Sequence, residues 1–238
     1  MESGILNEVF ENRTSSYRLF SRLFLKPLSA EEVEALAAME LEKAVAEMPE
    51  GLLAQGMNDM GRGLHRRHTG TQRLLSTDWT MAFDGVRSYE GNVATPYASI
   101  FAGSITGENA ILFQEPRALD LKVYHAEGIQ ADPDLHLPED HLSFELSFMA
   151  DTSEWIAAAV AAGNMAEALR LIDVSEDFRT NHILTWYPQF FDLAMKLVET
   201  RFYRGVLRAT FGFLELDGET LAELKAMLSG EGEEGATE

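Results

Sequence analysis

The chain has 238 residues, and 46% of them are apolar, which is enough for a packed core in one large domain or two small ones. The 39 acidic and 19 basic residues give a formal net charge of −20, which disfavours nucleic-acid phosphates and anionic membranes and favours basic peptide partners. There is no cysteine, which excludes disulfides, thiolate nucleophiles, iron–sulfur ligation and cysteine-based zinc sites. The N-terminal residues lack the basic and apolar regions of a secretory signal, so we expect a cytoplasmic protein.

The beginning of the chain shows helical periodicity. Apolar residues recur three, four or seven apart between Leu6 and Phe24 and predict a long first helix, which must end before Pro27. Ser29 and Glu32 have the spacing of a capping box. They predict a second helix that continues to the next proline of the chain.

Further helices are expected over 51–67, 71–83 and 116–127. The first of these contains three glycines, so we expect it to be short, broken or closely packed. Four glycines and few helical repeats make 84–115 a long irregular connection, and connections of that length are often functional.

The distribution of prolines and glycines also suggests a division of the chain. Two prolines in the stretch before the most informative helix mark a linker at 131–137, between an N-terminal helical lobe, 1–130, and a C-terminal helical lobe, 138–229. The acidic, glycine-containing tail, 230–238, is expected to be disordered. Because no segment shows period-two alternation, the fold class is all-α, a multi-helix bundle of two lobes joined by a proline-containing linker.

The most informative segment is 138–149, which places an acid and a histidine side by side at the start of an apolar helix. Pro138 suits the first helical position, because its fixed φ is already helical and its missing N–H needs no partner there. Glu139 and Asp140 would then lie at the positive end of the helix dipole, with His141 next to them.

This segment resembles the Pro-x-Asp-His-x-x-x-x-Leu-x-Phe-Met signature of the TorD/DmsD family, cytoplasmic chaperones for molybdenum-cofactor oxidoreductases that the twin-arginine pathway exports. Three further blocks support the resemblance in the right order. The segment 17–24 is similar to the family's first helix, 96–101 to its Pro-Tyr-x-Ser segment, and 182–188 with 202–205 to its C-terminal helices. One departure is Leu137, where the family often has glutamate.

The resemblance implies an all-helical, TorD-like chaperone and not an enzyme, with no cofactor of its own. Such a chaperone binds the twin-arginine leader, and the body, of one molybdopterin oxidoreductase. It assists cofactor insertion and withholds export until the client is mature. The linker would permit either a monomer or a dimer that exchanges lobes.

A twin-arginine leader has two arginines before an apolar run, so its binding site needs acids beside aromatic and apolar groups. Asp140 and His141 belong to a matched motif, whereas the hydrophobic core is at least as good a place for Trp79 and Tyr89. The candidate peptide-binding residues are Pro138, Glu139, Asp140, His141, Pro96, Tyr97, Trp79 and Tyr89.

Three other interpretations use the same residues. In a purely structural one, Asp140 caps the N-terminus of the helix and His141 packs or forms a hydrogen bond across the boundary between the two lobes. In another, Asp140, His141 and Glu145 bind the metal of a small helical hydrolase, although the second closely spaced histidine of a strong metal site is missing and no stoichiometric metal is expected. In the third, the protein is a helical adaptor whose acidic groove binds a different partner. Phosphate loops and nucleophile elbows are absent from the sequence, which disfavours an enzyme.

A basic cluster occupies 62–73, in an otherwise acidic chain. Contact with a phosphate or nucleotide is conceivable there, but a solvated face that balances neighbouring acids is the favoured interpretation.

Overall fold

A computed structural model of the chain describes residues 2–65, 68–84, 93–101, 115–130 and 137–230. Within these ranges all regular structure is helical and there is no strand, which confirms the all-α expectation. The elements are α1 Glu2–Leu25, α2 Ala30–Ala38, α3 Leu41–Ala44, the 3-10 turn η1 Val45–Glu47, α4 Leu52–His65, α5 Thr71–Phe83, α7 Glu115–Ala126, α8 Leu142–Ala161, α9 Met165–Phe178, the π-helix η3 Arg179–Ile183, α10 Leu184–Leu197 and α11 Arg201–Ser229. A further helical turn covers 98–101.

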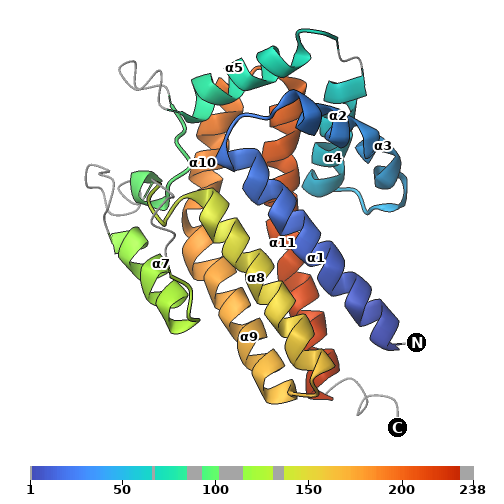
Figure 1. Cartoon of the computed structure of the whole chain (residues 1–238), viewed down its shortest axis with the longest axis vertical. Helices are drawn as coiled ribbons and strands as arrows, with labels where there is room; N and C mark the ends of the chain where they lie inside the picture. The colour runs from blue at the N-terminus through green and yellow to red at the C-terminus, as the bar shows by residue number, and fades with distance from the viewer. Residues whose placement is uncertain (1, 66–67, 85–92, 102–114, 131–136, 231–238) are drawn as a thin grey trace.

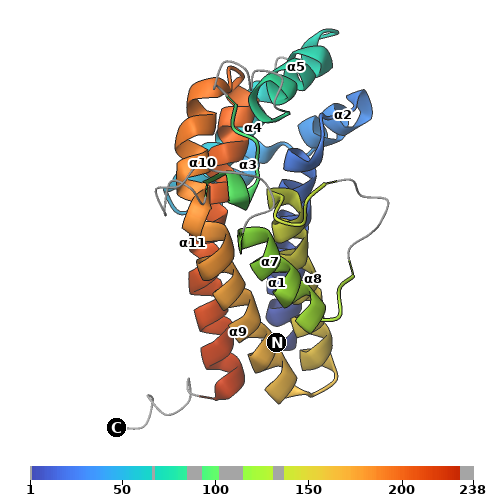
Figure 2. The same ribbon diagram turned by 90° about the vertical axis from the view of Figure 1, so that its left-hand side faces the viewer.

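The long helices form a bundle (Figure 1). Helix α1 packs along α8, α4 along α11, and α8 against α9, while α7 lies on the outside of the bundle beside α8 and α9 (Figure 2). The start of α1 and the end of α11 lie at the same end of the molecule (Figure 1). The bundle therefore brings together helices that are far apart in the sequence.

One hydrophobic cluster forms most of the core. It contains Tyr17 and Phe24 of α1 together with Leu146 of α8 and Trp186 of α10, so both predicted lobes contribute to it. The division at 131–137 stays a prediction, and nearly all of that linker lies outside the described residues, as does most of the predicted disordered tail. No helix in the described part of the chain is long and apolar enough to cross a membrane.

The second predicted helix is correct at its start and wrong at its end. Ser29 and Glu32 form the expected reciprocal capping box at α2. The helix then stops at Ala38, and Glu40 adopts a left-handed conformation with φ 48° before α3 and η1 begin. Leu41 follows this break and lies in the core, where it is 6% exposed.

The glycines of α4 allow close packing, and the helix is unbroken. A Cβ atom on Gly56 would lie 2.2 Å from the backbone nitrogen of Ala209 in α11, and one on Gly63 would lie 2.9 Å from that of Phe202. The absence of side chains at these positions lets the two helix backbones approach each other. Close packing, one of the three expected outcomes for this helix, is the one observed.

Helices α9 and α10 form one continuous helical run through the π-helix η3. A π-helix has a wider turn than an α-helix and shifts the register of the residues that follow it. His182 lies in this segment, and its ring stacks on Phe178 with a centroid separation of 4.5 Å. This stacking holds the His182 ring against the end of α9.

Candidate functional site

Two of the segments that the sequence motifs single out meet in the structure. We call the region formed by 96–101 and 138–142 the junction. The N–H groups of Ala98 and Leu142 each donate a backbone hydrogen bond to a carbonyl of the opposite segment, at 3.0 and 2.9 Å. An isolated antiparallel bridge lies between these bonds. The family-like Pro-Tyr-x-Ser and Pro-x-Asp-His motifs are thus two halves of one structure.

Asp140 lies inside the junction. Its carboxylate Oδ2 accepts the N–H of Ser99 at 2.9 Å, and its side chain is fully buried. Although Asp140 is one of the candidate peptide-binding residues, its carboxylate is not at the surface, where it could pair with an arginine of a peptide. The reason is that the carboxylate satisfies a backbone donor at the start of the helical turn 98–101, which would otherwise be buried without a partner.

His141, and not Asp140, caps α8. Its Nδ1 accepts the N–H of Ser143 at 3.1 Å, and its backbone is extended there, with φ −75° and ψ 132°. The helix begins at Leu142, so the prediction of Pro138 as its first residue is wrong: the Pro138 carbonyl instead accepts the N–H of His141 and closes a turn before the helix. Burial lowers the pKa of His141 to about 3, so the ring is neutral and able to accept at physiological pH.

Tyr97 and Glu139 are the partly exposed groups of the junction. The Tyr97 ring packs edge-on against His141, and burial, together with the nearby charge of Asp140, raises its pKa to about 12. The carboxylate of Glu139 pairs with Arg117 of α7, which lowers its pKa, and the side chain is 18% exposed. The junction therefore presents a neutral phenol ring and a carboxylate to solvent.

The other predicted peptide-binding residues lie within the junction, in the hydrophobic core or outside the described residues. Pro96 is buried and Pro138 partly buried within the junction. Trp79 lies in the core, where it is 6% exposed and its indole N–H donates to the carbonyl of Leu23 at 3.1 Å. Tyr89 lies outside the described residues.

A buried acid cluster that was not predicted from the sequence adjoins the junction. Asp120 of α7 accepts from His182 Nδ1 at 2.5 Å, and Glu145 of α8 accepts the indole N–H of Trp186 at 3.2 Å. Both carboxyl groups are buried, 1% and 0% exposed. Burial raises the pKa of Asp120 to about 6, against the opposing effect of its bond to His182. Burial and the charges of Asp120 and Asp140 hold the pKa of Glu145 well above its usual value.

A cavity of about 70 Å³ lies beside this cluster, and we call it the acid pocket. Leu119 at its edge is 45% exposed, and Asn181 and Thr185 are also exposed, so the cavity opens to the surface between α7 and α10. Its lining residues are Ala98, Pro116, Leu119, Asp120, Glu145, Asn181, His182, Thr185 and Trp186. Among the residues that the structure describes, no three histidine or acidic side chains are placed to hold a metal ion, so the hydrolase interpretation has no support.

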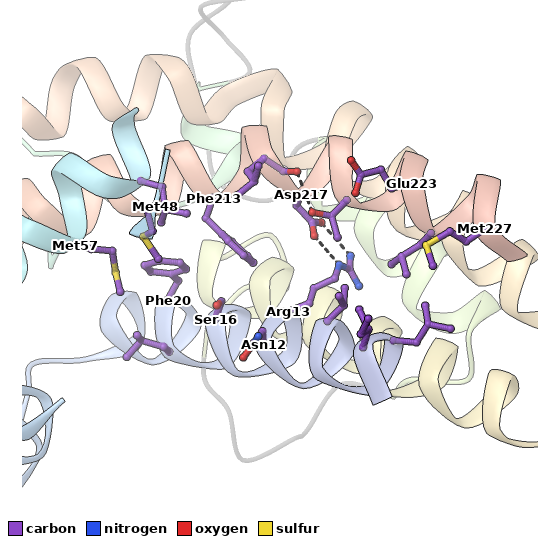
Figure 3. Close-up of a pocket in the computed structure, with 18 residues that line it drawn as sticks. Asn12, Arg13, Ser16, Phe20, Met48, Met57, Phe213, Asp217, Glu223 and Met227 are labelled. Carbon is purple, nitrogen blue, oxygen red and sulfur yellow. Dashed lines mark hydrogen bonds and ion pairs between the residues drawn. The ribbon is translucent and has the colours of Figure 1, made fainter. Parts of the chain in front are cut away.

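A second, larger hollow lies between α1 and α11, and Figure 3 shows its lining. This groove has a volume of about 510 Å³, and its walls are mostly apolar, with Met48, Met57 and Met227 among them. None of the predicted peptide-binding residues lines it. Arg13 crosses the groove to Asp217, which it meets with Nε at 2.6 Å from Oδ1 (Figure 3).

A family model described as nitrate reductase delta subunit matches residues 35–192, which is more than half of the chain. The chain belongs to this family. The matched range contains the junction and the acid pocket, and leaves out α11.

Similar proteins cover nearly the whole chain. The chaperone protein TorD of Vibrio parahaemolyticus is 28% identical over 214 residues, which is 89% of this chain and 95% of the relative. The chaperone protein TorD of Vibrio cholerae is 26% identical, and the match covers 94% of this chain and 96% of the relative. That of Aliivibrio salmonicida is 28% identical, and the match covers 91% of this chain and 98% of the relative. The resemblance to the TorD family is confirmed, and these relatives are chaperones by name and not enzymes.

Proposed function

We propose that the protein is a system-specific chaperone for one molybdopterin oxidoreductase. It binds the twin-arginine leader of that client, and the client body, assists cofactor insertion and withholds export until the client is mature. It acts in the cytoplasm, before export, by binding and not by turnover. The likeness to chaperones named TorD over about nine-tenths of the chain supports the proposal.

The observation that carries the leader-binding step is the composition of the junction. An arginine side chain binds well to a carboxylate and to the face of an aromatic ring. Glu139 and Tyr97 supply these two groups from adjoining segments, and Asp140 holds the segments together from inside. The net charge of −20 also attracts a basic leader from a distance.

Binding of the leader is coupled to the maturation state of the client body. A leader that is bound to the chaperone is withheld from the export machinery, and its apolar run is masked. If an immature client body also contacts the chaperone, the two contacts reinforce each other, and by linkage the maturation of the body weakens the hold on the leader. Release of the leader then follows cofactor insertion.

The test is calorimetry of this protein with the leader peptide of the molybdoenzyme encoded nearest to its gene. We expect binding of the natural leader and at least about a tenfold loss when both arginines are replaced by glutamine. Tyr97→Ala and Glu139→Gln should each weaken binding about two- to fivefold, since both groups are only partly buried. Glu154→Gln removes an equal charge from an exposed part of α8 and should have no effect.

Arg117 offers a test in the opposite direction. Arg117 forms an ion pair with the Glu139 carboxylate in the free protein, so an arginine of the leader must displace Arg117 from that carboxylate. Arg117→Gln should therefore strengthen leader binding, and the gain should vanish in the double variant with Glu139→Gln. Equal affinity of the wild type for the natural and the glutamine leader would refute leader recognition.

A further inference from the structure

The acid pocket contains hydrogen-bond acceptors that the folded chain leaves without partners. Asp120 Oδ2 and Glu145 Oε2 are buried and, when both acids are ionised, have no hydrogen-bond donor within the described part of the chain. Asp140 Oδ1 and Ser99 Oγ, in the adjoining junction, are in the same condition. Buried polar atoms in native proteins nearly always have partners, so an unpaired group of this kind requires an explanation.

The shape of the acid pocket limits what can enter it. A volume of about 70 Å³ holds a few waters or one small head group, and excludes a nucleotide or a peptide backbone. Exposed Leu119, Asn181 and Thr185 lie at the mouth, and the indole of Trp186 and the two carboxyl groups are buried. The pocket thus has one apolar side chain at a mixed entrance and is acidic inside.

We propose that the acid pocket is a binding site for the guanidinium group of one arginine side chain, supplied by the client leader. The inference rests on the proposed function for the source of the arginine, and on the pocket alone for the chemistry. An arginine has an apolar stem that can lie against Leu119 and a planar head with five donors and no acceptor. That head matches a pocket whose unpaired carboxyl oxygens accept hydrogen bonds and whose wall is an aromatic plane.

The free protein has to balance these acids in another way. The groups that face Glu145 are Asp120 and Tyr124 from α7, Asp140 ahead of α8, and Trp186 from α10. With no cation present, burial and the charges of Asp120 and Asp140 raise the pKa of Glu145 and favour its protonated form, which can donate a hydrogen bond to Asp120. A guanidinium ion makes this proton unnecessary. Arginine binding is therefore coupled to proton release.

The position of the acid pocket suits a leader with two neighbouring arginines. Pro116 lines the pocket, and the next residue along α7, Arg117, pairs with Glu139 of the junction. Two anionic positions thus adjoin the same turn of α7. One arginine enters the pocket while its neighbour displaces Arg117 from Glu139.

The first experiment is calorimetry of the leader with wild type and Glu145→Gln. Glutamine keeps an acceptor for Trp186 and a donor for Asp120, so the variant should fold, which a thermal melt checks. We expect at least a tenfold loss of affinity, and no further loss when the pocket arginine of the leader is replaced by glutamine. Glu154→Gln, on the same helix, is the matched control. If Glu145→Gln fails to fold, Asp120→Asn takes its place.

Proton release is measured on the wild type in two buffers of different ionisation enthalpy. We expect release of up to one proton per leader bound near neutral pH, and none from the leader that lacks both arginines. Two outcomes would overturn the guanidinium site. One is that the losses of binding free energy from Glu145→Gln and from the replaced leader arginine add up when both changes are combined. The other is that the measured binding enthalpy is the same in the two buffers.

A small probe separates this inference from the proposed function. Arginine amide is titrated into the protein while the indole N–H resonance of Trp186, assigned with Trp186→Phe, is followed by NMR. We expect a saturable shift in wild type that is absent in Glu145→Gln. A leader that binds wild type and Glu145→Gln equally, with no shift by arginine amide, overturns the pocket and leaves leader binding intact. A shift by arginine amide without any leader binding supports the pocket and overturns the proposed function.

Discussion

Asp140 supports Ser99 from inside the protein, because its carboxylate Oδ2 accepts the Ser99 N–H at 2.9 Å. The backbone carbonyl of Asp140 also accepts the N–H of Ala98, the residue before Ser99, at 3.0 Å. A motif that resembles a surface recognition signature is thus an internal brace for a second motif about forty residues earlier in the chain. Its effect on partner binding is through the position of the segment it holds.

We predict that Asp140→Ala destabilises the protein by about 1 to 3 kcal/mol, because it leaves a buried N–H of Ser99 without an acceptor. Asp140→Asn should cost less, since the amide oxygen can accept the same bond. Urea denaturation gives the free energies, and hydrogen exchange at the Ser99 amide should accelerate in the alanine variant. Unchanged exchange at Ser99 in both variants would contradict the role of a brace.

The His141 cap should make stability depend on pH. The folded protein keeps His141 neutral down to a pKa of about 3, whereas the unfolded chain binds a proton below about pH 6.5. The unfolded state therefore gains protons first as the pH falls, and this contribution to stability is lost on acidification. The Asp120 carboxyl, whose pKa is raised, acts in the opposite sense and stabilises the fold at lower pH.

His141→Asn isolates the histidine effect, because asparagine can cap a helix but does not titrate. Between pH 7 and about pH 4.5, wild type should lose about 2 kcal/mol more of its free energy of unfolding than the variant. The contribution of Asp120 is common to both proteins and cancels. Parallel pH profiles for the two proteins would show that the pKa of His141 is the same in the folded and the unfolded chain, and would contradict the neutral cap.

The pair of Arg13 and Asp217 should be far more important for stability than the surface ion pairs. Both side chains are buried, and Tyr17 also donates to Asp217, at 2.6 Å. Asp217→Asn leaves the guanidinium buried without its counter-charge and should cost about 3 to 5 kcal/mol. The matched control is Asp151→Asn, which removes a partly exposed partner of the exposed Arg18 and should cost at most about 1 kcal/mol. Similar midpoints of urea unfolding for the two variants would contradict this ranking.

Gly56→Ala should destabilise the protein although alanine favours helix. The new Cβ would lie 2.2 Å from the backbone of Ala209, and a backbone cannot rotate aside as a side chain can. We expect a loss of about 1 to 3 kcal/mol. Gly4→Ala, in α1 with open space around it, should be neutral or stabilise by up to about 1 kcal/mol. In thermal melts, the melting temperature of Gly56→Ala should therefore fall below that of the wild type, and that of Gly4→Ala should be unchanged or rise.

The features that the sequence predicted are those set by neighbouring residues. The capping box of Ser29 and Glu32 and the bounds of α5 follow from local hydrogen bonding and periodicity, and both are as expected. The start of α8 was predicted wrongly because Pro138 has a local preference for a first turn, whereas contacts with 96–101 determine where the chain enters the helix.

The acid pocket had no local signal at all. Asp120 and His182 are 62 positions apart, and Glu145 looked like part of a helix face with His141. A buried carboxyl group and an exposed one have the same letter in the sequence, and only the packing of α7 against the bundle distinguishes them. The chain did contain one indirect sign, since His182 begins one of the segments that matched the family.

The π-helix at Arg179–Ile183 also has a consequence for how this chain tolerates insertions and deletions. A π-turn contains one residue more than the α-helical turn it replaces. Deletion of a single residue there would restore an ordinary α-helical turn and leave the helix after it facing nearly the same way, because the wider turn had accommodated the extra residue. Trp186 would still reach Glu145, whereas the backbone around His182, inside the π-turn, would be rebuilt and its contact with Asp120 changed. Relatives in which this segment is one residue shorter should therefore keep the wall of the acid pocket at Trp186 and differ from this chain at the place of His182.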